Sequence, residues 1–164
     1  KWRYVMKQVT FMMLKPDAFA NHQEDEVVAM LTAHGLCIEK SCRLEVTMEV
    51  MKVLLDHYHG VIDAMDKEFN FPGKLFASFY YNGPRYIQPM RVSYDGEEDI
   101  ITLTRQLVGK TNPAEAGPET IRGRFSEDNY EKASREKRLV NNVIHASDAK
   151  ESAERELQIW QNYL

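Results

Sequence analysis

The sequence predicts an α+β domain in which helices cover one antiparallel sheet, close to a β-α-β-β-α-β arrangement. Three observations support this fold class. A nearly continuous apolar run at 9–14 is typical of a central strand that is buried on both faces. Strand-like and helix-like patterns then alternate along the chain. Near the end, the β-branched pair at 143–144 leads into an amphipathic helix at 149–163.

The length of the chain bounds the domain organisation. Its 164 residues are enough for one hydrophobic core, and the sequence shows neither an internal repeat nor a linker. We therefore expect residues 1–164 to form a single domain, with a short lead-in at 1–8.

Helices and strands of the first half are predicted from the spacing of apolar residues. Helices are expected at 24–34 and 48–58, because apolar side chains recur every three or four positions, and Thr47 is placed to cap the second helix. Residues 36–46 alternate between apolar and polar side chains, which predicts a half-buried strand. Residues 74–81 resemble a short helix that ends at an Asn-Gly-Pro turn.

The second half contains one strand, one helix and two longer irregular segments. Residues 87–94 are strand-like, and Pro89 favours an edge or bulged position because proline cannot donate to a ladder. A helix is predicted at 99–108 and a loop at 109–123, which is rich in Gly, Pro, Thr and Asn. The highly charged segment 126–138 is expected to be a solvated surface excursion.

Composition excludes several classes of protein. Hydrophobic residues make up 43% and charged residues 28% of the chain, and the formal net charge is −4, so a global basic footprint for nucleic acid or anionic membrane is absent. The sequence shows neither a secretory signal nor an apolar run long enough to span a bilayer. Cys37 and Cys42 are too few for a zinc site and fit a reducing compartment. We expect a cytoplasmic protein without specific nucleic-acid or membrane partners.

His145 is the first candidate for chemistry. It follows the β-branched pair at the end of a strand, and Asp148 is placed as the N-cap of the last helix, with Glu151 as its capping-box partner. Ser147 lies two residues on, and Glu156 borders the buried face of that helix. A histidine in this setting can serve as a nucleophile or base. Histidines at strand ends more often only donate or accept hydrogen bonds, and this stretch alone leaves both roles open.

A group of cations and a hydroxyl forms the second candidate. Lys15 precedes Pro16, which favours an extended backbone and places Lys15 at the carboxyl end of the central strand, where ligands of α/β sheets bind. Arg105 ends a predicted helix, and Thr111 and Arg122 lie in the loop that follows. Arginine suits bidentate capture of phosphate oxygens, while lysine acts as a point charge. Surface arginines are common, so each one alone indicates little.

Two other patterns indicate less. Gly109-Lys110-Thr111 resembles the end of a P-loop, but the first glycine of that motif would fall at Thr104. His57 and His59 lack a carboxylate at metal-ligand spacing, so we expect surface or capping histidines.

Five motifs occur in an order that points to a known family. They are Lys-Pro-Asp at 15–17, His-Tyr at 57–58, Thr-Asn-Pro-Ala at 111–114, Thr-Ile-Arg-Gly at 120–123 and Asn-Val-Ile-His-Ala-Ser-Asp at 142–148. Glu-Ser-Ala-Glu at 151–154 and Trp160 extend the match. From Val9 onward, the chain resembles the nucleoside diphosphate kinases.

The resemblance implies a ferredoxin-like fold with added helices and a long nucleotide-site loop. It also implies a ping-pong reaction, in which a histidine takes a phosphoryl group from a nucleoside triphosphate and passes it to a nucleoside diphosphate. His145 matches that histidine. The other matches are Ser147, Glu156 and Tyr58 as supporting residues, Lys15, Arg105, Thr111 and Arg122 as phosphate-binding residues, Asn142 as the sugar contact, and Leu139 with Phe71 or Phe76 as the two sides of a base sandwich.

Cofactor and assembly also follow from the resemblance. Mg²⁺ is expected to arrive with the nucleotide phosphates rather than in a metal site of the protein. The partners are then ATP and other nucleoside tri- and diphosphates. Family members are hexamers or tetramers, so a homo-oligomer is expected.

The chain departs from the family pattern at a few positions. Ala18 and Ala146 stand where the family usually has glycine, and Ala146 is tolerable if its backbone φ is negative. Segments near 61–72 and 126–138 look longer than in typical members. Two other functions therefore stay open: a nucleotide-binding regulatory protein of the same fold with weak or no turnover, and an interaction module without nucleotide binding.

Overall fold

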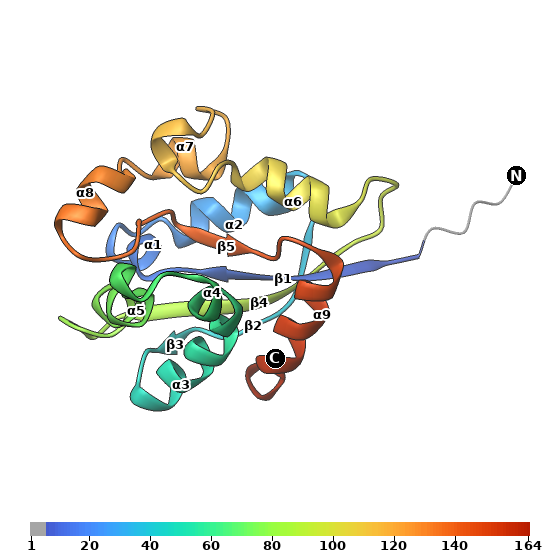
Figure 1. Cartoon of the computed structure of the whole chain (residues 1–164). Coiled ribbons are helices and arrows are strands. Elements are labelled where there is room, and N and C mark those ends of the chain that lie inside the picture. The colour runs from blue at the N-terminus through green and yellow to red at the C-terminus, as the bar shows by residue number, and fades with distance from the viewer. Residues whose placement is uncertain (1–5) are drawn as a thin grey trace, which may run out of the picture.

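A five-stranded antiparallel sheet forms the centre of the molecule (Figure 1). The computed structural model describes residues 6–164. The strand order is β2-β4-β1-β5, and β3 pairs with β4. The strands are β1 (Gln8–Leu14), β2 (Cys37–Ser41), β3 (Leu44–Glu45), β4 (Tyr86–Tyr94) and β5 (Ile144–Ala146). The predicted fold class, an antiparallel sheet covered by helices, is confirmed.

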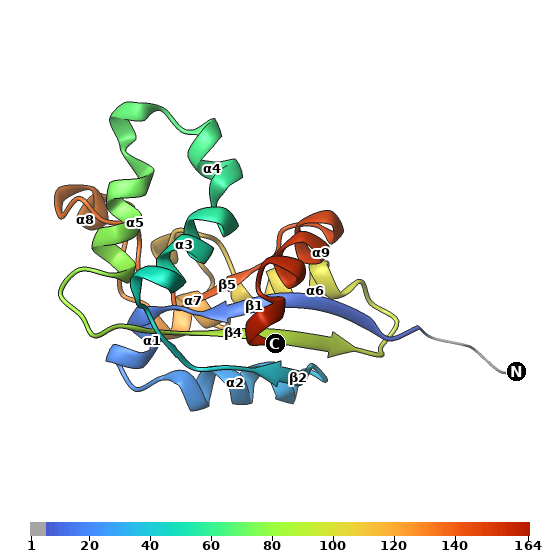
Figure 2. The same ribbon diagram turned by 90° about the horizontal axis from the view of Figure 1, so that it is seen from below.

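Helices cover both faces of this sheet, with α2 on one side and α3 and α5 on the other (Figure 2). The α-helices are α1 (Pro16–Ala20), α2 (Glu24–Ala33), α3 (Met48–His57), α4 (His59–Ala64), α5 (Phe71–Phe79), α6 (Ile100–Val108), α7 (Ile121–Phe125), α8 (Tyr130–Arg135) and α9 (Lys150–Ile159). Three 3₁₀ turns, η1 (Lys67–Phe69), η2 (Pro113–Glu115) and η3 (Gln161–Tyr163), complete the elements of the described chain.

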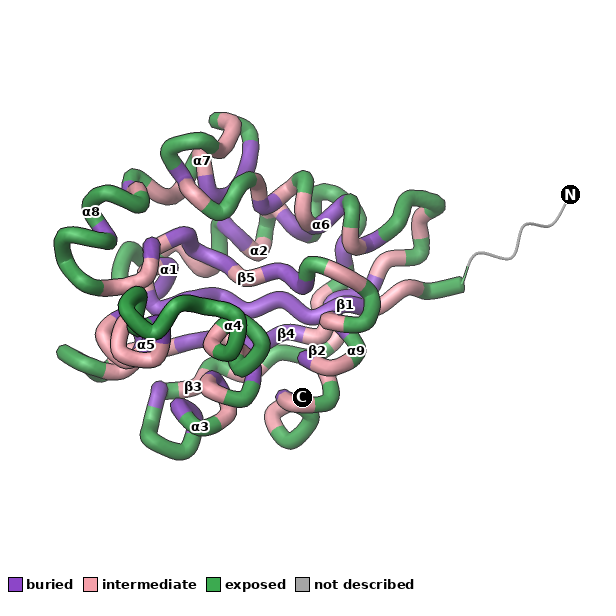
Figure 3. Tube along the Cα trace, viewed as in Figure 1, coloured by how far each residue is buried: buried purple, intermediate pink, exposed green. Residues whose placement is uncertain are grey.

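Strand β1 is buried along most of its length because alternate side chains enter two separate cores (Figure 3). Met12 and Leu14 pack with residues of α2 and α6, whereas Phe11 and Met13 pack with residues of α3 and α5 and with Trp160. Successive side chains of a strand point to opposite faces, so a strand covered on both faces needs apolar residues throughout. This accounts for the continuous apolar run in the sequence.

Strand β4 corrects one expectation. It lies between β2 and β1, so the predicted edge position of Pro89 is wrong. Pairing with β2 ends at Met90 and pairing with β3 begins at Ile87, which leaves Pro89 between the two ladders. Its carbonyl still accepts from the Cys42 N–H at 3.2 Å. The missing proline donor therefore falls at a break in the neighbouring strand, where the predicted single strand 36–46 divides into β2 and β3.

The charged segment 126–138 packs more closely than predicted. Arg138 donates two hydrogen bonds to the carboxylate of Asp128, at 2.6 and 3.0 Å, and Asp128 is only 9% exposed. Ala133 of α8 is also buried. A fully solvated excursion is therefore wrong, because this segment contains a buried ion pair and a buried helical residue. The structure also has helix α4 directly after α3, where the sequence predicted no helix.

The last helix is shorter than predicted and begins differently. It spans Lys150–Ile159, with Ala149 rather than Asp148 at its N-cap. Asp148 accepts a hydrogen bond from the Ser152 hydroxyl at 2.6 Å instead of capping a backbone N–H. Ala153 and Trp160 are buried, as expected for the apolar face of the amphipathic helix predicted at 149–163.

None of the helices within residues 6–164 is both long and apolar enough to cross a bilayer.

Candidate active site

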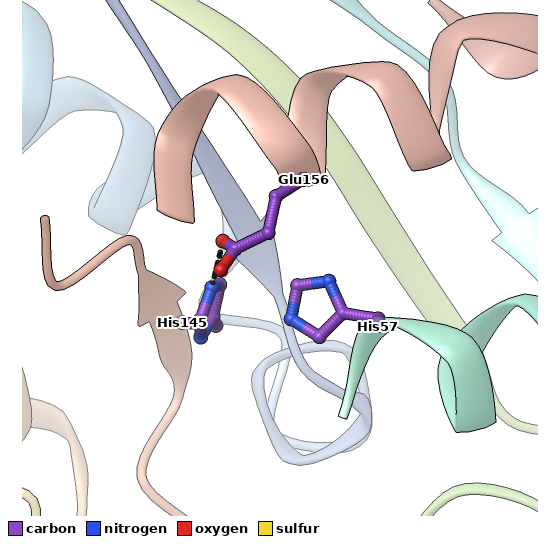
Figure 4. Close-up of side chains that lie close together, drawn as sticks. All are labelled: His57, His145 and Glu156. Carbon is purple, nitrogen blue, oxygen red and sulfur yellow. Dashed lines mark hydrogen bonds and ion pairs between the residues drawn. The ribbon is translucent and has the colours of Figure 1, made fainter. Parts of the chain in front are cut away.

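His145 lies in the middle of β5, opposite Met13 of β1, and its side chain is partly exposed. Its Nε2 lies 2.7 Å from Oε1 of Glu156, which reaches across from α9 (Figure 4). A carboxylate offers only acceptors, so this contact places the imidazole proton on Nε2. The lone pair of the neutral ring is then on Nδ1, which is the nitrogen available for nucleophilic attack.

Glu156 connects His145 to Ser147. The Ser147 hydroxyl donates to the same Oε1 at 2.8 Å, and the carbonyl of Phe11 is an alternative acceptor at 3.1 Å. Glu156 is 4% exposed, and buried hydrogen bonds to a charged acceptor are stronger than those in water. The structure thus brings together three residues that the sequence associated with each other.

The backbone just before His145 is strained. Val143 has a φ of 76°, which a β-branched residue rarely adopts, and the Ile144 N–H donates to Asn142 O at 2.8 Å across it. The Val143 N–H donates to Asp17 Oδ2, and its carbonyl accepts from the Lys15 N–H, each at 2.9 Å. Such strain costs about 1–3 kcal/mol and persists where surrounding contacts enforce it. Here the contacts come from the end of β1.

Arg122 donates hydrogen bonds to this strained segment. Its guanidinium donates to the carbonyls of Asn142 at 3.2 Å, Gly109 at 3.1 Å and Ile144 at 2.8 Å, and the residue is 4% exposed. Burial, with a smaller contribution from the nearby Arg105, lowers the pKa of Arg122 to about 10. Arg105 itself donates to the carbonyl next to His145, that of Ala146, at 3.2 Å.

Lys15, Asn142 and Thr111 form a chain of hydrogen bonds. Lys15 Nζ donates to Asn142 Oδ1 at 2.6 Å, and Asn142 Nδ2 donates to the Thr111 carbonyl at 3.0 Å. Burial lowers the pKa of Lys15 to about 8, and the repulsion from Arg122 adds to this effect against the attraction of Asp17. Cations that repel one another in this way favour an anion placed among them.

The aromatic candidates separate into two groups. The Tyr58 ring centroid lies 6.2 Å from that of His145 and 5.6 Å from that of Phe71, and burial raises the pKa of Tyr58. Phe71 is buried in the core, whereas Phe76 and Leu139 are partly buried at its border. The Leu139 N–H donates to Ser78 Oγ on α5 at 2.8 Å, which places the candidate base-contacting residues on neighbouring segments.

His57 is the residue that sequence reasoning missed. It was expected at the surface or as a cap, but it is 3% exposed, and its ring centroid lies 4.7 Å from that of His145. The sequence has no carboxylate at metal-ligand spacing from His57, but the fold brings Glu156 close to it, because ligand atoms of His57, His145 and Glu156 all lie within 4.8 Å of one another. The signal was present: Val50, Leu54 and His57 follow one helical face, and all three are buried.

Both alanines at the positions where the family resemblance leads us to expect glycine are accommodated. Ala146 is buried in β5 opposite Met12 and is outside the group of described residues with positive φ. Ala18 is fully buried within α1. The backbone at Ala146 therefore tolerates a Cβ, as its negative-φ condition required.

Comparison with known proteins gives consistent matches. Residues 8–163 match the family model for nucleoside diphosphate kinase. The nucleoside diphosphate kinase of Exiguobacterium sibiricum is 37% identical over 151 residues, which cover 92% of both chains. That of Streptococcus thermophilus is 34% identical over 153 residues, covering 93% of this chain and 97% of the relative.

Solved structures show the same likeness. A nucleoside diphosphate kinase from Borrelia burgdorferi, a transition-state mimic with bound vanadate and ADP, superposes with a TM-score of 0.82 at 25% identity, covering 96% of this chain and 90% of that one. A nucleoside diphosphate kinase from Pyrobaculum aerophilum gives 0.73 at 26% identity, covering 94% and 96%. With the family model spanning nearly the whole chain, the protein belongs to the nucleoside diphosphate kinase family.

Proposed function

We propose that this protein is a nucleoside diphosphate kinase that transfers the γ-phosphoryl group of a nucleoside triphosphate to a nucleoside diphosphate through Nδ1 of His145, and so maintains nucleoside triphosphate pools. The observation that carries this proposal is the contact of His145 Nε2 with Glu156, which leaves the Nδ1 lone pair free. The family match over residues 8–163 supports the same reaction.

The two half-reactions balance at a single nitrogen. The Nδ1 lone pair of His145 attacks the γ-phosphorus, the bond from that phosphorus to the β–γ bridging oxygen breaks, and the nucleoside diphosphate leaves with the bonding electrons. The phosphorylated ring is cationic until the second step, and Glu156 stabilises its Nε2–H. A terminal β-phosphate oxygen of another nucleoside diphosphate then attacks the phosphorus, which returns the electron pair to Nδ1.

The cations near His145 would neutralise the charge of the transferring group. Lys15, Arg105 and Arg122 supply positive charge, and Thr111 supplies a hydroxyl donor. Arg122 is held by backbone carbonyls, so it adds a fixed charge and also maintains the strained turn before His145. Such preorganised charge avoids the cost of rearrangement when the reaction occurs.

The nucleoside part of the substrate would bind on the side of these cations that faces away from His145. Asn142 is the proposed sugar contact, through the amide that already links Lys15 to the loop at Thr111. A base held between Leu139 and one of Phe71 or Phe76 would be recognised by stacking rather than by hydrogen bonds. Stacking is tolerant of base identity, which fits a kinase that accepts several nucleotides.

Mg²⁺ would enter as part of the substrate, bound to nucleotide phosphates. The carboxylate beside His145 fits this arrangement, because Glu156 already accepts hydrogen bonds from His145 and Ser147. Magnesium usually keeps several waters and binds substrate phosphates. When bound, the ion would neutralise charge on the β- and γ-phosphates.

Assembly and location are part of the same proposal. Because the family resemblance implies hexamers or tetramers, we infer a homo-oligomer of this chain acting in the cytoplasm on ATP and other nucleoside tri- and diphosphates.

The test is incubation with γ-labelled ATP and Mg²⁺, followed by acid and alkali treatment of the labelled protein. An acid-labile, alkali-stable label that added GDP removes as GTP would demonstrate a phosphohistidine intermediate. His145→Ala should abolish the label, while His59→Ala, at an exposed histidine, is the matched control. Label persisting in His145→Ala would exclude His145 as the nucleophile. Nucleotide binding without any label would favour a regulatory nucleotide-binding protein.

A further inference from the structure

His57, His145 and Glu156 have the composition of a transition-metal site. One ligand atom from each lies within 4.8 Å of the others (Figure 4). Two histidines and a glutamate are a ligand set that binds Zn²⁺ in enzymes. A metal bound here would displace the Nε2 proton of His145 and so replace the hydrogen bond from His145 to Glu156. The chain therefore places its proposed nucleophile within reach of an inhibitory metal site.

A hydrogen bond from the opposite side determines the state of His57. Trp160 Nε1 donates to His57 Nδ1 at 3.1 Å, and Trp160 is fully buried. An indole N–H is a donor only, so Nδ1 of His57 must present a lone pair. In the neutral ring the proton is then on Nε2. A doubly protonated ring has no lone pair on Nδ1, so the same hydrogen bond excludes it.

Nε2, the protonated nitrogen of His57, is the one that faces His145. The His57 ring points toward His145 in Figure 4, and its Nδ1 is engaged by Trp160. A histidine binds a metal through an unprotonated nitrogen. Nε2 of His57 therefore lacks the lone pair that a metal shared with His145 and Glu156 would need.

We propose that Trp160 is a tautomer lock: by holding the proton of His57 on Nε2, it keeps His57, His145 and Glu156 from binding Zn²⁺ and leaves His145 free for phosphoryl transfer. The benefit for catalysis rests on the proposed role of His145, but the lock itself does not. Trp160 acts through His57 and is thus a positioning residue.

The alternative tautomer is blocked by the packing of Trp160. If His57 carried its proton on Nδ1, two N–H donors would face each other in the core, and a buried unpaired donor is costly. Trp160 cannot readily turn away, because its ring stacks on Phe11 with centroids 6.0 Å apart and planes 14° apart. The Phe11 ring also contacts the His57 ring, with centroids 5.5 Å apart, so Phe11 restrains both Trp160 and His57.

The experiment measures Zn²⁺ binding to nucleotide-free protein by calorimetry in a buffer that does not chelate metals. Trp160→Phe removes the indole donor and allows His57 to present Nε2. We expect it to bind one Zn²⁺ about 10- to 100-fold more tightly than the wild type, the range by which partners of ligating histidines alter metal affinity. The matched control is Trp160→Phe combined with His57→Gln, which keeps Cys37, Cys42 and the exposed histidines and should return binding to the wild-type background.

Three results would overturn the lock. The first is equal Zn²⁺ affinity in the wild type and in Trp160→Phe. The second is tight Zn²⁺ binding by the wild type that is lost in His57→Gln. The third is tight Zn²⁺ binding that persists in the double variant. If Trp160→Phe does not fold, long-range ¹H–¹⁵N NMR of the wild type decides, with His57 assigned by its loss in His57→Gln. A proton on Nε2 supports the lock, and a proton on Nδ1 refutes it.

The phosphoenzyme assay with γ-labelled ATP and Mg²⁺, run without Zn²⁺, separates this inference from the proposed function. A wild type that forms phosphoenzyme but binds Zn²⁺ tightly through His57 would disprove the lock and leave the kinase reaction intact. A wild type that forms no phosphoenzyme but holds the Nε2 proton would disprove the kinase mechanism and leave the lock intact.

Discussion

One oxygen atom of Glu156 determines which nitrogen of His145 is nucleophilic. Oε1 accepts from both His145 and Ser147, while Oε2 lies 3.7 Å from the guanidinium of Arg155. Ser147 thereby holds the carboxylate so that it faces the imidazole. Because the carboxylate is buried, rotating it away would break its hydrogen bonds with His145 and Ser147, and the cost of that loss keeps the geometry in place.

Replacing Glu156 with glutamine tests the importance of this oxygen. A glutamine can present its amide N–H to the ring, which favours the tautomer with the lone pair on Nε2 instead of Nδ1. We expect the rate of phosphoenzyme formation in Glu156→Gln to fall on the order of 10³-fold, with nucleotide affinity nearly unchanged. Single-turnover labelling measures it. The control is Glu154→Gln, because Glu154 is exposed on the same helix. A rate of phosphoenzyme formation in Glu156→Gln equal to that of the wild type would show that Glu156 has no role in the mechanism.

Lys15 predicts a pH dependence of nucleotide binding. Burial lowers the pKa of Lys15 to about 8, so the free protein loses this positive charge as pH rises through that value. Affinity for a nucleoside diphosphate should then fall by up to about tenfold per pH unit above 8. Titration calorimetry from pH 7 to 9.5 measures it, and the slope should disappear in Lys15→Met. An unchanged slope in that variant would assign the dependence to another group.

Folding stability should change in the opposite direction over the same range. The pKa of Lys15 is about 8 in the folded protein and 10.5 as a model value, so between these values the unfolded chain binds more protons. Stability therefore gains from this residue as pH rises from about 8 to 10.5.

At the level of elements, the segment between α7 and β5 is anchored rather than free. Asp128 accepts two hydrogen bonds from Arg138 and one from the Asn141 N–H at 2.8 Å. Asn141 immediately precedes Asn142, which binds Lys15. The ion pair thus determines where the chain enters the strained turn before His145, and α8 supports the site from outside it.

Asp128→Ala should therefore destabilise the protein. It leaves a mostly buried Arg138 without its partner, and we expect a loss of about 2–4 kcal/mol in the free energy of unfolding. Each kcal/mol corresponds to roughly 2–4 °C in Tm for a chain of this size, which calorimetry can resolve. Glu127→Ala, an exposed neighbour, should change little. An unchanged Tm in Asp128→Ala would show that the segment does not contribute to folding.

Acid should weaken the same ion pair. Burial alone would raise the pKa of Asp128, but hydrogen bonds from Arg138 and from the Asn141 and Asn129 backbone outweigh it and hold the pKa below its usual value. The stability contributed by Asp128 is therefore present above the ordinary carboxyl pKa and is lost as pH falls through the lower folded value.

At the level of the whole molecule, one sheet separates two cores. The strand β1 contributes to both, and β5 and α9 bring His145 and Glu156 together on the face shared with α3. The outer strand β2 is largely exposed and lies at one end of the strand order. An exposed edge strand is a surface that natural proteins usually cover.

Assembly follows as a prediction about the whole molecule. We expect a particle of six or four 19.1 kDa subunits, because an exposed edge and the family resemblance both favour association. Light scattering after size exclusion, over a range of protein concentrations, measures the mass. A mass equal to one subunit at every concentration would contradict the prediction.

The sequence determined those features that depend on local patterns. The continuous apolar run predicted β1, and helical spacing predicted α3 and α6, with Thr47 as the N-cap of α3. The family resemblance placed His145, Ser147 and Glu156 in one candidate site. These predictions succeed because spacing and capping act within a few residues of the chain.

Tertiary structure alone decided the surroundings of that site. His57 became a buried neighbour of His145 through Trp160, which is 103 residues away, and the positive φ of Val143 is held by contacts from Asp17 and Lys15. The position of Pro89 depended on where a neighbouring strand breaks. Each of these features depends on which distant segments meet, and the free energy of those contacts, rather than local propensity, selects the state that each residue adopts.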